Sequence, residues 1–138
     1  MQLGYKISSL IYQALNGNAP LKAIVSGIYP TTQKPIRAAN PCITLFIPTE
    51  IESVKVGVLS DAILTVVARS NYADGDGSEL QRIYDAVDVI LKDNHFQSTE
   101  VSGTLRASGQ SVSYGLWDEE SRDFFKMWKY RVKLKKRS

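Results

Sequence analysis

KMWKYRVKLK, residues 126–135, is the stretch that decides the fold, because apolar and basic side chains alternate along most of it. A period of two is typical of a β-strand that buries one face and leaves the other in solvent. The apolar positions are Trp128, Tyr130, Val132 and Leu134, and the basic positions between and after them are Lys129, Arg131, Lys133 and Lys135. The pattern predicts a strand whose apolar side enters a core and whose charged side points away from it.

Two earlier stretches predict the centre of the same sheet. Residues 42–47 and 62–70 are apolar at nearly every position, which is typical of strands covered on both faces. Weaker β-patterns lie around residues 99–107 and 111–116, and residues 27–30 predict a brief extended piece closed by a proline. The last third of the chain is therefore expected to be mainly β-structure.

Apolar residues recur every three or four positions in two places, which predicts two amphipathic helices. The first runs over residues 3–15 and stops at Asn16-Gly17, since both residues tolerate the left-handed conformation that ends helices. The second opens at Ser78, which has capping-box spacing to Gln81, and ends near Asp93. This order of elements predicts an α+β fold, with an antiparallel or mixed sheet and two helices packed on one face.

Residues 48–60, between the two central strands, alternate weakly through valines. We expect a long β-hairpin arm here, and a lone two-stranded arm is marginal in water unless it lies on a partner. Two features are unusual for a monomer: the connection is long, and the central strands are apolar on both faces. Both are explained if neighbouring subunits cover the arm and the second face of these strands. The predicted oligomer-interface residues are Val54, Val56, Val58 and Leu59.

The charge of the chain is unevenly distributed. Residues 126–138 carry seven basic side chains and no acidic one, although the whole chain has 17 basic and 14 acidic residues. The candidate partner-contact residues are Lys129, Arg131, Lys133, Lys135, Lys136 and Arg137. They mark a contact with nucleic acid or an anionic protein, or else a solvated strand protected by lysines, which is the simpler interpretation. A base-stacking platform is disfavoured, because rings and charges fall on opposite faces.

No catalytic, cofactor or metal site is recognisable, so no enzyme activity is expected. Cys42, the only cysteine, lies in a predicted buried strand, and His95, the only histidine, is expected to interact with the dipole of the preceding helix. Residues 74–78 begin like a calcium loop but lack its glycine at the sixth position. The acidic group at 118–123 is predicted to be a solvated loop. Both tryptophans, at positions 117 and 128, are expected to pack in the core.

At 138 residues the chain has the length of one domain, predicted to span residues 1–138. Its longest apolar run, residues 62–68, is too short for a membrane span. The apolar stretch at the N-terminus is interrupted by polar residues at helical spacing, unlike a signal peptide. We therefore expect synthesis and folding in the cytoplasm, without a membrane partner.

In this layout the chain resembles the tail-terminator (tail-completion) proteins of tailed bacteriophages. The resemblance extends over nearly the whole length and rests on a pattern of segments. Its parts are Leu15-Asn16-Gly17, Leu21-Lys22-Ala23-Ile24-Val25, Gly27-Ile28-Tyr29-Pro30, Asn40-Pro41-Cys42-Ile43-Thr44, the strand 61–70, the helix 79–91 and the final strand 128–134. The basic C-terminal segment has no counterpart in this pattern.

The resemblance implies a small α+β subunit that forms a homo-oligomeric ring of six, in the tail or neck of a virion assembled in the host cytoplasm. Such a ring caps the tail tube and docks it to the head, so the implied partners are the chain itself, the tail-tube protein and the head–tail connector protein. Contact with DNA passing through the ring stays open. The alternatives are a connector (adaptor) protein of the neck and, less favoured, a small nucleic-acid-binding module.

Overall fold

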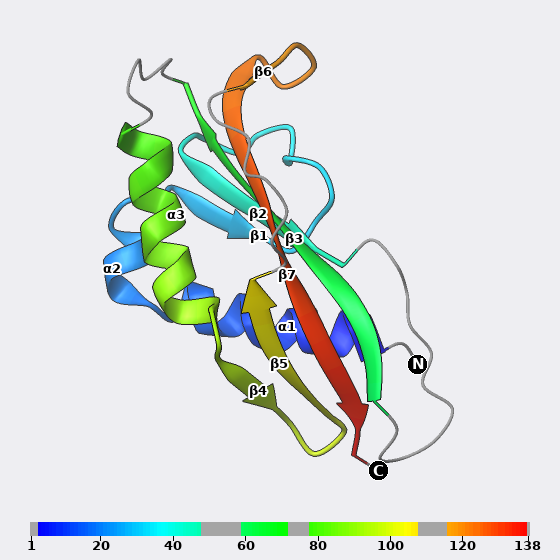
Figure 1. The fold of residues 1–138 in the computed structure, drawn as a ribbon. Helices are drawn as coiled ribbons and strands as arrows, with labels where there is room; N and C mark the ends of the chain where they lie inside the picture. The colour runs from blue at the N-terminus through cyan, green and yellow to red at the C-terminus, as the bar shows by residue number, and fades with distance from the viewer. Residues whose placement is uncertain (1–2, 48–58, 72–77, 108–115, 138) are drawn as a thin grey trace.

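The computed structural model describes residues 3–47, 59–71, 78–107 and 116–137. Along these segments two helices are followed by three strands, a third helix and four further strands (Figure 1). In chain order they are α1 (Leu3–Asn16), α2 (Ala19–Lys22), β1 (Gly27–Tyr29), β2 (Cys42–Phe46), β3 (Leu59–Ser70), α3 (Ser78–Leu91), β4 (His95–Gln97), β5 (Val101–Ala107), β6 (Leu116–Asp118) and β7 (Asp123–Lys136).

The strands form one mixed sheet of order β1-β2-β3-β7-β5-β4, and β6 pairs with the start of β7. β1 and β2 are parallel, and the other neighbours are antiparallel. The predicted α+β class with a mixed sheet is confirmed. The edge strand β4 was not predicted, because three residues are too few to show a period.

β3 and β7 form the centre of the sheet, and their pairing runs unbroken over all twelve residues of β3. The register places Leu64 opposite Tyr130 and Val66 opposite Trp128, so these side chains share one face. On this face Trp128 is 3% exposed and Tyr130 is 1% exposed. The inward orientation predicted from the alternation of the last strand is confirmed.

α1 and α3 both cover this face of the sheet, which we call the core face. Their buried residues are Ile7, Ile11 and Leu15 of α1, and Leu80, Ile83, Val87 and Leu91 of α3. At Gly103 of β5, an added Cβ would lie only 3.0 Å from Cδ1 of Ile7. Glycine at this position therefore lets α1 approach the sheet, and the prediction that both helices pack on one face is confirmed.

The start of α3 differs in detail from the predicted capping box. The helix begins at Ser78 as predicted, but the side chain of Gln81 bonds elsewhere. Its amide donates to Oδ1 of Asp85 at 3.0 Å, and its oxygen accepts from Nζ of Lys126 at 3.2 Å. Through the hydrogen bond with Lys126, Gln81 links α3 to β7. Lys126 lies on the core face and is almost fully buried, so its ammonium group needs an acceptor.

The predicted arm falls mostly on residues 48–58, so Val54, Val56 and Val58 lie outside the described residues, and Leu59 is the first residue of β3. β2 pairs with β3 from Cys42 opposite Arg69 as far as Phe46. The strand predicted at 111–116 also lies mostly outside the described residues, and β6 begins at its end.

Candidate interaction surface

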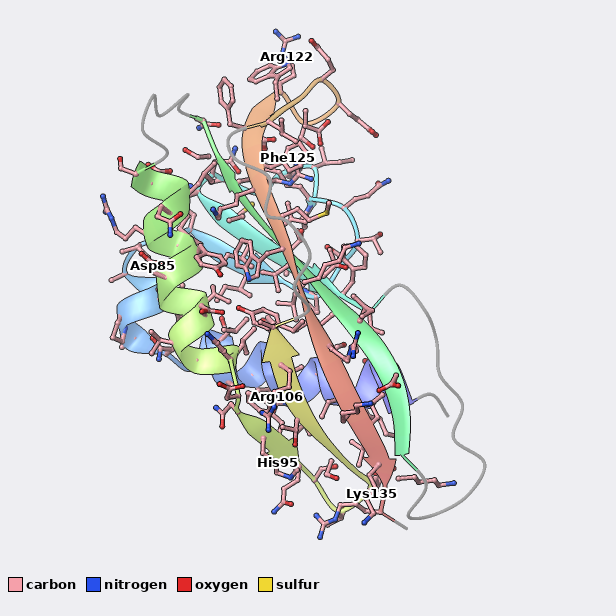
Figure 2. All side chains as sticks on the ribbon, in the orientation of Figure 1. Asp85, His95, Arg106, Arg122, Phe125 and Lys135 are labelled. Atoms are coloured by element: carbon pink, nitrogen blue, oxygen red, sulfur yellow. The ribbon has the colours of Figure 1, made fainter. Side chains whose placement is uncertain are left out.

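The side of the sheet that faces away from α1 and α3 presents a broad polar surface along β4, β5, β7 and the first half of β3. We call it the open face. By strand register it comprises Asp61, Ile63, His95, Gln97, Ser102, Thr104, Arg106, Lys129, Arg131, Lys133 and Lys135. Figure 2 shows three of its members, His95, Arg106 and Lys135, on neighbouring strands in the lower part of the sheet.

The open face is strongly basic. Its two ion pairs are exposed: Nζ of Lys133 lies 2.7 Å from Oδ1 of Asp61, and Nη1 of Arg106 lies 3.3 Å from Oδ1 of Asp93. Exposed pairs of this kind contribute little to stability. Lys129, Arg131 and Lys135 have no ion pair with any other described residue. Among the described residues the surface therefore carries an excess of positive charge, which attracts an anionic partner.

The structure brings four of the six predicted partner-contact residues together. Lys129, Arg131, Lys133 and Lys135 all lie on the open face, as their alternation predicted. Lys136 falls on the other face of β7. Arg137 turns to the β4–β5 connection, where its backbone N–H donates to the Glu100 carbonyl at 2.9 Å and its guanidinium donates to the Ser98 carbonyl at 2.6 Å.

Arg106 belongs to the same basic surface and was missed in the sequence. The signal was present, since β5 alternates between buried Val101, Gly103 and Leu105 and the outward Ser102, Thr104 and Arg106. Gly103 weakened that pattern because a glycine carries no hydrophobic side chain. Register places Arg106 opposite Arg131, so the basic surface spans two neighbouring strands.

A hollow of about 390 Å³ interrupts the open face, lined by Asp61, Ala62, Ile63 and Arg131. Ala62 points to the core, and the half-buried Ile63 supplies an apolar patch on the open side. Arg131 is exposed and lies opposite Ile63 across the strand pair. The hollow thus combines an apolar contact with one positive and one negative charge, a composition that suits a protein side chain.

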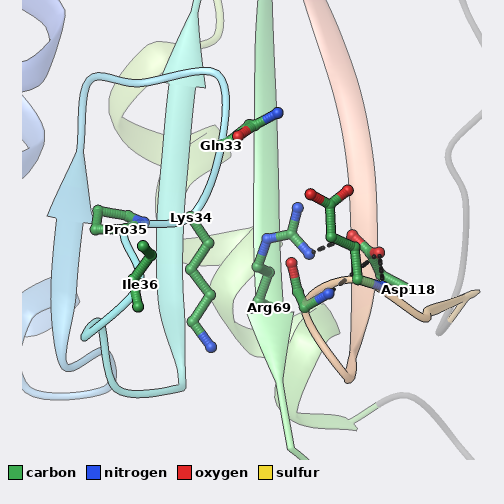
Figure 3. Close-up of a pocket in the computed structure, with 8 residues that line it drawn as sticks. Gln33, Lys34, Pro35, Ile36, Arg69 and Asp118 are labelled. Carbon is green, nitrogen blue, oxygen red and sulfur yellow. Dashed lines mark hydrogen bonds and ion pairs between the residues drawn. The ribbon is translucent and has the colours of Figure 1, made fainter.

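At the opposite end of β3 and β7, a buried ion network joins separate segments. Nη1 of Arg69 lies 3.0 Å from Oδ2 of Asp118 (Figure 3), and it lies at the same distance of 3.0 Å from Oδ1 of Asp123. Oδ2 of Asp123 also receives hydrogen bonds from Nζ of Lys34 at 3.3 Å and from Nδ2 of Asn40 at 3.0 Å. The network therefore fixes the loop before β2 and the β6–β7 turn to the end of β3.

This network corrects the prediction of a solvated acidic loop. Asp123 is completely buried, while Glu119 and Glu120 are exposed as expected. Burial acts to raise the pKa of Asp118, but hydrogen bonds from Arg69 and from the backbone N–H groups of Ser121 and Glu120 outweigh it and hold that pKa below its ordinary value. Asp118 is therefore ionised over the physiological pH range.

A second hollow of about 390 Å³ adjoins the network, lined by Gln33, Lys34, Pro35, Ile36, Arg69, Asp118, Glu120 and Ser121 (Figure 3). Three of its charged lining residues, Lys34, Arg69 and Asp118, take part in the ion network. Among the described residues, no group of three or more histidines, cysteines and acids is placed to hold a metal ion. The arrangement acts as a structural clamp.

Three further residues singled out in the sequence can be placed. Cys42 is fully buried, and burial raises the pKa of its thiol to about 11, so the thiol is protonated and unreactive at neutral pH. His95 was expected at a helix end, but it begins β4, where its Nδ1 lies 2.7 Å from Oγ1 of Thr104. Trp117 was expected in the core, but it is 44% exposed and packs edge-on against Phe124.

Across the described segments, none of the helices has the length and apolar character to cross a membrane. No protein-family model matches the chain, and no curated protein matches it.

Solved structures with a similar fold do exist. A chain of the virion of a native gene transfer agent particle is 17% identical, with 93% of each chain covered and a TM-score of 0.61. The bacteriophage SPP1 gp17 protein is 14% identical, with 100% of this chain and 98% of that chain covered and a TM-score of 0.57. At these identities the likeness shows that the fold is shared.

Proposed function

We propose that the chain is a structural virion protein of a tailed phage: a ring-forming tail terminator that caps the tail tube and joins it to the head. The observation that carries the proposal is a fold match along almost the whole chain with a protein of a gene transfer agent virion and with a bacteriophage SPP1 protein. The resemblance of the sequence to tail-terminator proteins supports the same assignment. The proposed partners are the chain itself, the tail-tube protein and the head–tail connector protein.

The open face supports a role in assembly. In the part of the chain that the structure describes, helices cover only the core face of the sheet, and the open face carries an excess of positive charge beside the partly exposed Ile63. Surfaces that combine apolar contacts with fixed charges are typical of specific protein interfaces. We assign Val54, Val56, Val58 and Leu59, together with the open face, to contacts within the ring.

A connector protein of the neck is the second candidate, since it would share the fold class and the ring habit. A small nucleic-acid-binding module is the third, and the specific observation in its favour is the row of basic residues on the open face. Its weakness is geometric: Trp128 and Tyr130, the rings that alternate with these basic residues, are buried on the core face. They cannot stack on bases from there.

The test is assembly of the purified chain, alone and with tail tubes. Light scattering after size exclusion should give species well above the 15.4 kDa of one chain, and electron microscopy should show rings that sit on tube ends. Rings that bind the head connector but never the tube would favour the connector. A strict monomer at high concentration that forms no rings with tubes contradicts both assembly roles.

A further inference from the structure

The helical side of the molecule carries a hydrophobic side chain that the chain itself leaves uncovered. Val89 of α3 is 85% exposed. Asp85 precedes it by four residues and is also exposed, so the two lie on one outward stripe of the helix. Tyr5 of α1 is the other strongly exposed hydrophobic residue among the described parts of the helices, at 72%. Single exposed hydrophobic residues are common, so the exposure of Val89 indicates an interface only if a complementary surface exists.

That complementary surface is the hollow on the open face. It offers Ile63 as an apolar contact and Arg131 as a positive rim. The stripe on α3 offers Val89 and, one helical turn before it, the carboxylate of Asp85. Asp85 has one hydrogen bond within the described structure, from Nε2 of Gln81, so it retains acceptor capacity towards a guanidinium.

The two surfaces also agree in charge and length. α3 has a net negative charge, with Glu79, Asp85 and Asp88 against Arg82, whereas the open face carries five basic residues against Asp61. Of the three acids Asp85 is the exposed one, since Glu79 accepts a hydrogen bond from Ser70 and Asp88 accepts one from Tyr130. A helix of 14 residues is about 21 Å long. The four basic residues of β7, from position 129 to position 135, extend over about 20 Å at the rise of a strand.

We propose that α3 of one copy packs against the open face of a second copy, with Val89 in the hollow beside Ile63 and Asp85 close to Arg131. This inference rests on the ring proposed above and names the surfaces that build it. Each sheet would then be covered by its own helices on the core face and by the neighbour's α3 on the open face. The contact joins two different surfaces, so it is heterologous and can close into a ring.

The contact cannot form within one chain, because the sheet lies between Val89 and Ile63. A disulfide between these positions therefore reports on contact between copies. The probe is the double variant Val89→Cys with Ile63→Cys, mildly oxidised and analysed on a non-reducing gel. Cys42 can stay in place because it is buried. A disulfide needs Cα atoms within about 7 Å of each other, so efficient cross-linking is specific for the proposed packing.

We expect a ladder of covalent oligomers, whose largest member gives the number of copies in the ring. The matched control is Tyr5→Cys with Ile63→Cys, which also pairs an exposed helical position with the hollow and should cross-link at least tenfold less. Rings seen by electron microscopy without cross-links through position 89 overturn this inference and leave the proposed function standing.

The remaining outcomes are equally decisive. Cross-linking that stops at dimers supports the α3 contact and contradicts a ring. A monomer without cross-links overturns both proposals. If cross-linking fails and short duplex DNA binds the open face tightly at low salt, the occupant is nucleic acid and the inference is wrong.

Discussion

The hydroxyl of Tyr130 donates a hydrogen bond to Oδ1 of Asp88 at 2.6 Å, and so joins the central strand β7 to α3 across the core. The same hydroxyl accepts a hydrogen bond from Nε1 of Trp128 at 3.0 Å. Burial, followed by the neighbouring Asp88, raises the pKa of Tyr130 far above its ordinary value. The phenol therefore stays protonated, and this chain of three polar groups fixes the position of α3 on the sheet.

We predict that Tyr130→Phe lowers the free energy of unfolding by about 1–3 kcal/mol. The substitution keeps the ring but leaves the buried N–H of Trp128 and one oxygen of Asp88 without a partner, and an unsatisfied buried group costs this much. Chemical denaturation measures the change. Tyr29→Phe, at a half-buried tyrosine of the edge strand β1, is the control and should change stability much less. If both variants lowered the free energy of unfolding equally, the hydrogen bonds that join Trp128, Tyr130 and Asp88 would have no special role in stability.

Trp128→Ala should destabilise the fold by about 3–5 kcal/mol, as large aromatic truncations in cores do. Trp128 is buried against the ring of Tyr84 in an edge-to-face pair with centroids 5.0 Å apart. Trp117→Ala is the matched control, because that tryptophan is 44% exposed and its loss should cost far less. Thermal or denaturant unfolding of both variants tests the difference. Similar losses of stability in both variants would mean that Trp117 is buried in solution, which contradicts its partly exposed position in the structure.

Asp118 gives the fold a dependence on acid. Its pKa is lower in the folded chain than the value of about 3.9 of an unfolded aspartate. A carboxyl whose folded pKa is depressed contributes stability above its unfolded pKa and loses that contribution as pH falls through the folded value. The free energy of unfolding should therefore drop below about pH 4, and Asp118→Asn should flatten part of that drop.

Unfolding curves between pH 2 and pH 7 measure the effect. Glu119→Gln is the control, since Glu119 is exposed and has no ion pair within the described structure. If Glu119→Gln flattens the profile as much as Asp118→Asn does, the ion pair with Arg69 is not the cause.

The sequence predicted those parts of the fold in which burial repeats with a local period. The alternation of β7 identified both its buried rings and its basic face, and the three-and-four spacing located α1 and α3. The pairing of Arg69 with Asp123 could not be predicted in this way, because 54 positions separate the two residues and only the sheet register brings them together. The same limit applies to the hollow, which joins Ile63 of β3 to Arg131 of β7.

Replacement of Lys129, Arg131, Lys133 and Lys135 by glutamine tests the function of the open face most directly. We expect the fold to remain nearly intact, because exposed charges contribute little to stability. Assembly should be lost or weakened, since the substituted surface no longer attracts the acidic α3 of a neighbour. Light scattering at several protein concentrations measures assembly, and the unfolding curve of the variant confirms that it is folded.

The salt dependence then separates a protein partner from nucleic acid. If the open face binds duplex DNA, the logarithm of the affinity should fall with the logarithm of salt concentration by about 0.9 per phosphate contacted, and the glutamine variant should flatten that slope. We expect instead that the parent chain binds DNA weakly at physiological salt and that its assembly weakens as salt rises. Arg122→Gln is the control, because this exposed arginine lies at the far end of β7 (Figure 2) and should alter neither property. Tight, salt-sensitive binding of duplex DNA by the parent chain, lost in the glutamine variant while assembly persists, would assign the open face to DNA.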